Sequence, residues 1–178
     1  TGSFSLTLEA KGRAGTVDLE AVSALAWARE LAPDRLTVTV SREASALAVR
    51  TAVAEKMEGA LAPSGFTDAG GKVRVTGDAQ KGFSITLTGE GETVRLPTRV
   101  SLYRRDASGQ EVLEGQLRAV LTGDFAFDTA EEITAESIAA QAAALTGDEK
   151  TSASARWSEE EGCWYLTLRR QGQEATVP

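Results

Sequence analysis

Three segments of this chain carry the same strand pattern, and this repetition limits the fold more than any other feature. Each segment places an aromatic and two aliphatic residues at alternate positions, followed by a glycine and then a Thr-Val pair. The aromatic residues are Phe4, Phe83 and Trp164, and the glycines, each eight residues later, are Gly12, Gly91 and Gly172. Alternation of this kind is typical of a half-buried β-strand. The sequence therefore predicts an internal duplication built on one type of strand.

The two later copies extend into their flanking segments. Leu36 lies 47 residues before Phe83, and Leu117 lies 47 residues before Trp164. Each unit is expected to contain a strand, a helix and two further strands, with a period of 81 residues. The expected parts are a leading strand and helix packed with the first repeat (1–35), the first α+β repeat (36–96), and the second α+β repeat, which includes a long hairpin (97–178).

The predicted fold class is α+β, a mostly antiparallel sheet with helices packed on one face and Thr, Ser and Arg side chains on the other. Helices are predicted at 18–32, at 45–62 and from Thr129, where Glu132 completes a capping box, to Leu145, with Gly147 as C-cap. Hairpins are predicted at 73–87, 93–121 and 153–168, and Pro97 indicates an edge strand or a bend in the second. Side-by-side repeats would give one continuous sheet, and face-to-face repeats a sandwich.

Charge and composition exclude several classes of partner. A net charge of −7 and a pI near 4.8 disfavour nucleic acid and anionic membranes, since both require clustered Lys and Arg. The single cysteine, Cys163, excludes an intramolecular disulfide. The chain as given shows no signal peptide, and no apolar run approaches the roughly 20 residues that span a bilayer. We expect a soluble protein, cytoplasmic or associated with a virion, unless a leader has been removed.

Few residues are suited to catalysis. Histidine is absent, which removes Ser-His and Cys-His nucleophiles and the commonest zinc ligand, and Gly89-Glu90-Gly91 is expected to be a turn. Asp124, Asp128 and Glu132 at the predicted start of the third helix are weak candidates for Mg²⁺ or Ca²⁺. Helix capping and the helix dipole explain the same acids better. We predict no catalytic residue, no metal site and no cofactor.

The remaining unusual residues point weakly to a protein partner. The two basic doublets, in Tyr103-Arg104-Arg105 and Arg169-Arg170, could anchor an acidic partner surface. The tryptophans are expected in the core, Cys163 is expected to be structural, and the acidic run 159–161 is expected in a solvated turn. The tryptophans are Trp27, Trp157 and Trp164.

These observations favour a non-catalytic structural or protein-interaction subunit of a larger assembly, such as a virion or an injection machine. Its partners would be other protein subunits, in a homo- or hetero-oligomer, because open edge strands recruit further strands. Two alternatives stay open. One is a carboxylate- or metal-dependent hydrolase in which Asp124, Asp128 and one further acid converge in a pocket. The other is a small-ligand binding module with its pocket between the two repeats.

Overall fold

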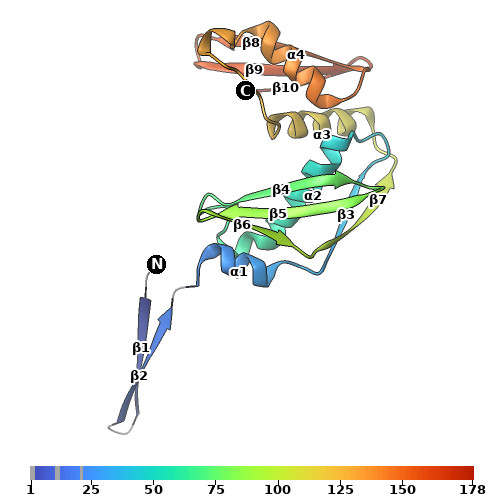
Figure 1. The fold of residues 1–178 in the computed structure, drawn as a ribbon. Helices are drawn as coiled ribbons and strands as arrows, with labels where there is room; N and C mark the ends of the chain where they lie inside the picture. Colours follow the sequence, from blue (N-terminus) through green and yellow to red (C-terminus); the bar gives the residue numbers. More distant parts are fainter. Residues whose placement is uncertain (1–2, 11–12, 21) are drawn as a thin grey trace.

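The structure is a computed structural model that describes residues 3–10, 13–20 and 22–178, and its α+β class is the predicted one (Figure 1). The strands are β1 (Ser3–Ala10), β2 (Arg13–Glu20), β3 (Arg35–Ser41), β4 (Lys72–Asp78), β5 (Gly82–Gly89), β6 (Glu92–Leu96), β7 (Arg99–Arg105), β8 (Thr151–Ser158), β9 (Cys163–Arg170) and β10 (Gln173–Val177). The helices are α1 (Ala24–Leu31), α2 (Ala46–Leu61), α3 (Gly109–Leu121) and α4 (Ala135–Thr146), with the short 3-10 helices η1 (Ala62–Ser64) and η2 (Ala130–Glu132).

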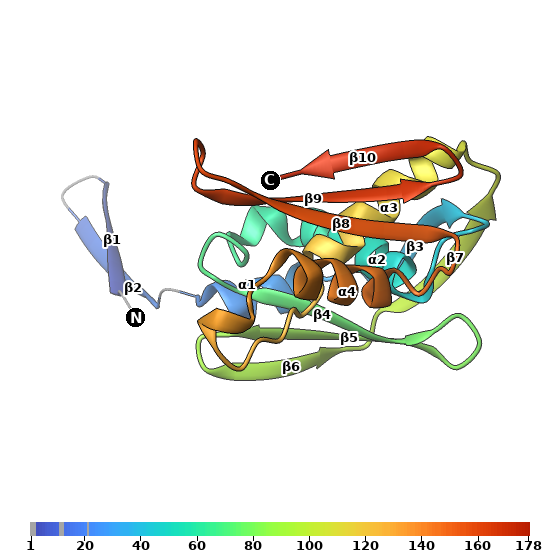
Figure 2. The ribbon, with the colours of Figure 1, turned by 90° about the horizontal axis from the view of Figure 1, so that it is seen from above.

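The strands are divided among separate sheets. Two three-stranded antiparallel sheets, β4-β5-β6 and β8-β9-β10, are accompanied by the β1-β2 hairpin and by a parallel pair, β3 with β7. Helices α1 and α2 pack on the first three-stranded sheet, and α3 and α4 pack on the second (Figures 1 and 2). We call α1, α2, the parallel strands β3 and β7 and the β4-β5-β6 sheet the first unit, and α3, α4 and the β8-β9-β10 sheet the second unit. The two units form neither a continuous sheet nor a sandwich, because each three-stranded sheet buries its apolar face under its own helices.

Each unit has its own hydrophobic core, centred on its middle strand. In the first core Ile85 and Leu87 of β5 are both fully buried, and in the second Leu166 and Leu168 of β9 are 6% and 0% exposed. Each residue of β9 follows its counterpart in β5 by 81 residues. The repeated sequence pattern thus corresponds to a repeated structural position, the buried central strand of a three-stranded sheet.

A two-residue turn explains the repeated glycine. Glu90 and Gly91 join β5 to β6, and Gln171 and Gly172 join β9 to β10. All four residues have positive φ, 54° and 80° in the first turn and 50° and 80° in the second. A type I′ turn requires positive φ at both central residues, and glycine adopts this conformation without steric cost. The turn predicted at Gly89-Glu90-Gly91 is therefore present.

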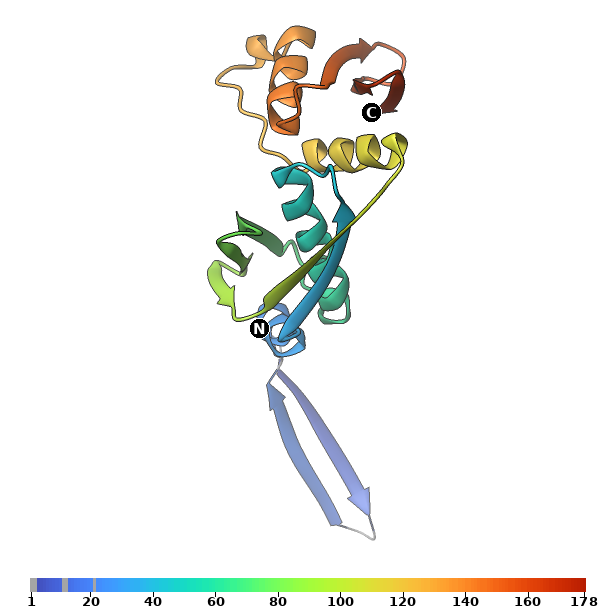
Figure 3. The ribbon, with the colours of Figure 1, turned by 90° about the vertical axis from the view of Figure 1, so that its right-hand side faces the viewer.

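The β1-β2 hairpin repeats the register of β5 and β6. Leu8 pairs with Gly15, as Leu87 pairs with Val94, and these equivalent residues are 79 apart in the sequence. Gly12, the glycine of the first sequence copy, lies outside the described residues. The hairpin extends away from the rest of the chain (Figure 3). The two strands therefore pair with each other as β5 and β6 do, and a third copy of this hairpin stays a prediction.

The helix predicted at 18–32 is shorter than expected. Residues 13–20 pair with β1 as strand β2, so the helix can begin only after them. Ser23 caps α1 by accepting a hydrogen bond from the N–H of Ala26 at 3.1 Å. In addition, the side chain of Glu90 accepts the N–H of Ala24 at 3.1 Å, which ties the start of α1 to the β5-β6 turn.

The long hairpin predicted at 93–121 is wrong, because its second arm is helix α3. Ser108 accepts the N–H of Glu111, and the Glu111 carboxylate accepts the N–H of Ser108, both at 3.2 Å, which forms a capping box. Leu113, Leu117 and Val120 follow at helical spacing and are buried. Since Leu117 lies in a helix, the expected order strand, helix, strand, strand holds only for the first unit.

Two other expectations concern the bend at Pro97 and the bounds of the last helix. Pro97 does bend the chain, since β6 ends at Leu96 and β7 begins at Arg99. The predicted helix start at Thr129 is wrong, because that residue precedes the 3-10 helix η2 and makes no capping hydrogen bond. Helix α4 starts instead after Thr134, whose capping box is with Ser137, and ends at Thr146, one residue beyond the predicted Leu145. Its C-cap is Gly147, as predicted, with φ of 60°.

Candidate functional site

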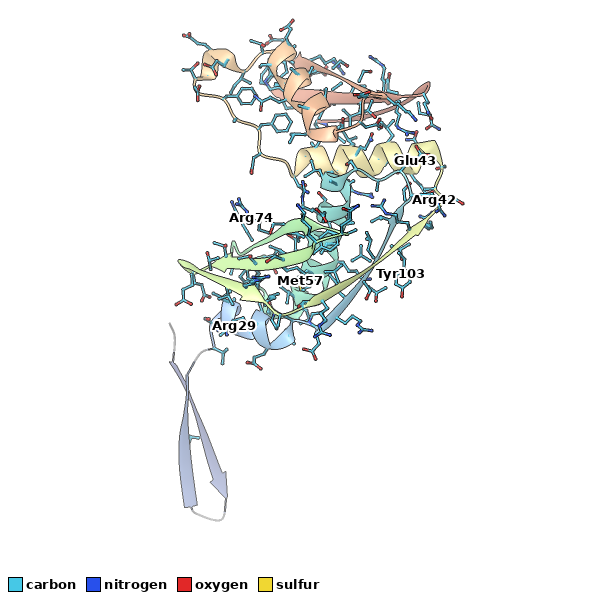
Figure 4. All side chains as sticks on the ribbon, turned by 45° about the vertical axis from the view of Figure 1, so that its right-hand side comes forward. Arg29, Arg42, Glu43, Met57, Arg74 and Tyr103 are labelled. Carbon is cyan, nitrogen blue, oxygen red and sulfur yellow. The ribbon has the colours of Figure 1, made fainter. Side chains whose placement is uncertain are left out.

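Tyr103 and the basic doublet Arg104-Arg105 lie on β7, which pairs in parallel with β3. In this register Arg35 lies opposite Arg99 at one end, and Ser41 lies opposite Arg105 at the other. We call these two strands the β3–β7 pair. Its inner face is buried in the first core, and its outer face is open, with Tyr103 60% exposed. Figure 4 shows Tyr103 on the side of the pair that faces away from α2.

Arginines occupy both ends of this outer face. At the end near the strand C-termini, Arg105 forms an ion pair with Glu111 at 2.6 Å, which raises the pKa of Arg105 and lowers the pKa of Glu111. Arg104 instead donates to backbone carbonyls in the turn after β3. At the other end Arg35 and Arg99 are register partners, and neither has an ion pair among the described residues. The start of the pair thus carries two arginines without an ion pair, beside the exposed acid Asp34, whose carbonyl accepts the N–H of Arg99 at 2.9 Å.

Arg170 does not lie at the surface, contrary to the expectation for the second doublet. Its side chain is 4% exposed, Nε donates to Asp148 at 2.9 Å, and Nη2 donates to Glu43. Asp148 also accepts from Gln116 and Thr151, both at 2.9 Å. Burial raises the pKa of Asp148, but these hydrogen bonds outweigh burial and hold the pKa well below its usual range. Arg170 ties the β3–α2 loop to the second unit and is unavailable to a partner.

The acids predicted at the start of the helix from Thr129 lie instead along the loop between α3 and α4. Asp124, Asp128 and Glu132 are all exposed, and the N–H of Asp128 donates to Glu132 at 3.0 Å. In the part of the chain that the structure describes, no group of three acidic or cysteine side chains could hold a metal ion. The geometry therefore gives no support to the metal candidates or to a carboxylate-based hydrolase.

A cleft of about 650 Å³ lies at the junction of the two units, where a ligand pocket was one expectation. One wall is formed by α2 and β4, and the other by the loop after α3 and by Leu145. Burial, with a smaller contribution from the neighbouring carboxylate of Glu55, raises the pKa of Glu58 in the first wall. The cleft also contains Asp124, but neither Asp128 nor Glu132 lines it.

Two of the three tryptophans are outside the core, contrary to prediction. Trp27 is 49% exposed because α1 buries Leu25 and Ala28 instead. Trp157 is 44% exposed and packs edge-on against Trp164, with ring centroids 5.6 Å apart. Trp164 itself packs against the second core.

Cys163 gains no support as a reactive residue. Its Sγ lies 3.9 Å from a carboxylate oxygen of Glu161, which also accepts a hydrogen bond from the Tyr165 hydroxyl. The polar neighbour is thus an acid, whereas reactive cysteines lie beside bases or cations. The acidic run 159–161 occupies the β8–β9 turn, as predicted, and is exposed.

The charges of the chain are unevenly divided, a signal that the sequence contained and that the overall charge conceals. Residues 1–105 hold 14 Lys and Arg and 12 Asp and Glu, whereas residues 106–178 hold 5 and 14. The first part is therefore near +2 and the second near −9. Arg169, one of the few cations of the second part, is paired with Glu174 at 2.6 Å. The second unit presents an acidic surface.

No helix in the described ranges is both long and apolar enough to cross a membrane. Comparisons with protein-family models, with curated proteins and with solved structures find no match. Function must therefore be argued from the surfaces of this chain alone.

Proposed function

We propose that this chain is a non-catalytic subunit of a larger protein assembly and that it contacts its neighbours through the outer face of the β3–β7 pair. The exposure of that face carries the proposal. Parallel strands occur almost only where both faces of the sheet are covered. Here one face is covered by the first core, and the other presents Tyr103 to solvent. The face also carries Thr and Ser side chains, but its Tyr103 and its arginines are of the types enriched among residues that dominate protein interfaces.

The edges of the pair support the same proposal. Within the described ranges β3 and β7 are hydrogen-bonded as strands only to each other. A two-stranded pair is a small fragment of sheet, and its unpaired edges are places where another chain can add a strand. A neighbouring subunit could therefore cover the outer face, extend the pair, or do both.

A photo-crosslinking residue at position 103 tests this proposal. The purified chain is expected to give crosslinked species of defined mass from position 103, and none from Lys81, an exposed control in the β4–β5 turn. Tyr103→Ala is expected to weaken association about tenfold, because loss of a central interface aromatic costs more than about 1 kcal/mol. A chain that yields only uncrosslinked monomer from position 103 at every concentration would contradict the proposal.

A second candidate function is ligand binding in the junction cleft. The observation that favours it is Glu58, because an acid with a raised pKa in a cleft is a common feature of functional sites. A fragment screen read by NMR should then shift signals from both walls, and Glu58→Gln should abolish the response to basic fragments. Shifts confined to one wall would count against a cleft ligand.

A further inference from the structure

We infer that copies of this chain join head to tail, with the acidic loop around Ile133 of one copy docked in a basic hollow between β6 and β7 of the next. This inference rests on the proposed assembly function and names the partner as a second copy of the chain. It goes further by identifying the two surfaces that meet and the chemistry of each.

The hollow lies where the chain bends from β6 into β7 and measures about 630 Å³. Arg95 and Arg99 on its wall are exposed, and neither forms an ion pair within the described part of the chain. The apolar residues of the wall are Phe83, Leu96, Pro97 and Val100. Leu96 belongs to the first core, so the accessible apolar part of the hollow comes from exposed Pro97 and from half-buried Phe83 and Val100. The hollow thus combines this apolar part with two arginines that form no ion pair, and Arg99 also belongs to the outer face of the β3–β7 pair.

The acidic loop has the complementary character. Ile133, at the end of η2, is 39% exposed. Glu131, Glu132 and Glu136 surround it in the sequence, are exposed, and have no ion pair in the ranges that the structure describes. An exposed aliphatic side chain flanked by carboxylates without an ion pair complements a hollow flanked by guanidinium groups without an ion pair. Interfaces are commonly anchored in this way, by an apolar residue in a pocket within a charged rim.

One molecule cannot make this contact with itself. In Figures 1 and 3 the loop between α3 and α4 lies at the top of the chain, and the bend between β6 and β7 lies in its lower half, with α2 and α3 between them. A contact between these two surfaces must therefore join two copies. Because the surfaces differ, the contact is heterologous, and it produces a ring if the rotation closes and a filament if it does not.

The charge of the whole chain favours the same orientation. The first part, near +2, attracts the second part, near −9, of another copy, whereas two second parts repel each other. Fields of this kind are screened beyond about 8 Å at physiological salt, so they steer the approach and leave the short-range contact to Ile133.

Charge reversal of each surface, alone and in mixture, tests the inference. Arg99→Glu changes the hollow, and Glu131→Lys with Glu136→Lys changes the loop without removing a side-chain hydrogen bond of the described structure. Each variant alone is expected to lose about tenfold or more in its self-association constant by sedimentation velocity, which corresponds to 1.4 kcal/mol. An equimolar mixture should recover complexes, because the intact loop of one variant meets the intact hollow of the other.

Matched controls separate docking from general attraction. Lys81→Glu makes the same charge change as Arg99→Glu at an exposed turn, and Glu159→Lys with Glu160→Lys matches the loop variant in the β8–β9 turn. These controls are expected to leave the association constant within about twofold. Ile133→Ser, which changes no charge, is expected to lower it about tenfold.

The outcomes distinguish this inference from the proposed function. If the wild-type chain associates and crosslinks from Tyr103, but the reversals act no more strongly than their controls, the docking surfaces are wrong and the assembly function stands. Failure of the mixture to recover complexes also overturns the head-to-tail contact. If the wild-type chain neither associates nor crosslinks at any concentration, both the inference and the proposed function fail.

Discussion

Replacing Arg170 by methionine should destabilise the second unit, because the carboxylate of Asp148 then loses its cation inside the protein. The two side chains are 4% and 20% exposed, and 2.9 Å separates Nε from the carboxylate oxygen. Removing one partner of a buried ion pair costs about 3–5 kcal/mol. Asp148 keeps hydrogen bonds from Gln116, Thr151 and the N–H of Lys150, so we expect a loss of about 3 kcal/mol, the lower end of that range.

The two carboxylates that bind Arg170 should contribute unequally. The Glu43 side chain is 56% exposed, and pairs that solvent screens to this extent contribute about 0.2–1 kcal/mol. Double-mutant cycles with Glu43→Gln and Asp148→Asn measure each coupling separately. The coupling of Arg170 to Asp148 is expected to exceed its coupling to Glu43 by at least about 1 kcal/mol.

Urea unfolding followed by circular dichroism gives these free energies. A loss of about 3 kcal/mol corresponds to a fall in Tm of about 6–12 °C for a chain of this size. Arg169→Met is the matched control, because Arg169 and Glu174 form an exposed pair whose loss should cost less than about 1 kcal/mol. A loss for Arg170→Met no larger than that of Arg169→Met would refute the interpretation of this network as a buried ion pair.

Three further predictions concern pH, the N-terminal hairpin and the two cores. The pKa of Asp148 is lower in the folded protein than in the unfolded chain, where it is about 4, so ionised Asp148 stabilises the fold above about pH 4. This contribution is lost as the pH falls towards the folded pKa. The difference in the free energy of unfolding between wild type and Asp148→Asn, measured with urea, should therefore narrow below about pH 4. Deleting residues 1–20 should change the free energy of unfolding by less than about 0.5 kcal/mol, because the β1-β2 hairpin extends away from the rest of the chain (Figure 3). A larger loss on urea titration would mean that the hairpin packs on the body. Leu87→Ala and Leu168→Ala should each cost about 2–5 kcal/mol, and the double variant should equal their sum within about 0.5 kcal/mol, because each residue is fully buried in a different core; a clear departure from additivity would show that the cores are coupled.

The elements that were predicted correctly are those whose sequence signals are local, that is, contained within a few neighbouring residues. Helix α2 has apolar residues at helical spacing and a stop at Pro63, which the structure places in η1, just after the end of the helix. The β4-β5 and β8-β9 hairpins carry apolar residues at alternate positions, and a polar turn joins the two strands of each hairpin. In such segments the local pattern and the global fold agree, so the pattern alone is sufficient to predict the element.

Helix α3 shows how two patterns can compete in one segment. Leu113, Leu117, Ala119 and Leu121 can be interpreted as an alternating strand, but Leu113, Leu117 and Val120 also have helical spacing. The Ser108–Glu111 capping box decided in favour of the helix, and the prediction overlooked it. In this segment the capping box, which directly precedes the apolar residues from Val112, was the better guide than the short alternation.

The candidate site was only partly predictable, because its main features depend on long-range contacts. The exposure of Tyr103 depends on the pairing of β7 with β3, strands that are 64 residues apart in the sequence. The burial of Arg170 depends on Asp148 and on Glu43, 127 residues away. A basic doublet in a sequence thus identifies charge, but only the fold decides whether the charge faces solvent.

The surfaces that we propose to meet lie where the two units differ. The shared hairpins β5-β6 and β9-β10 keep the register and turn that each core requires. The β3–β7 pair exists only in the first unit, because the second has helix α3 where the repeat spacing expects a strand. The acidic loop, in turn, precedes α4 only in the second unit. Two identical units would each present both surfaces or neither. Because these units differ, each chain has one surface of each kind, the condition for a directional head-to-tail contact.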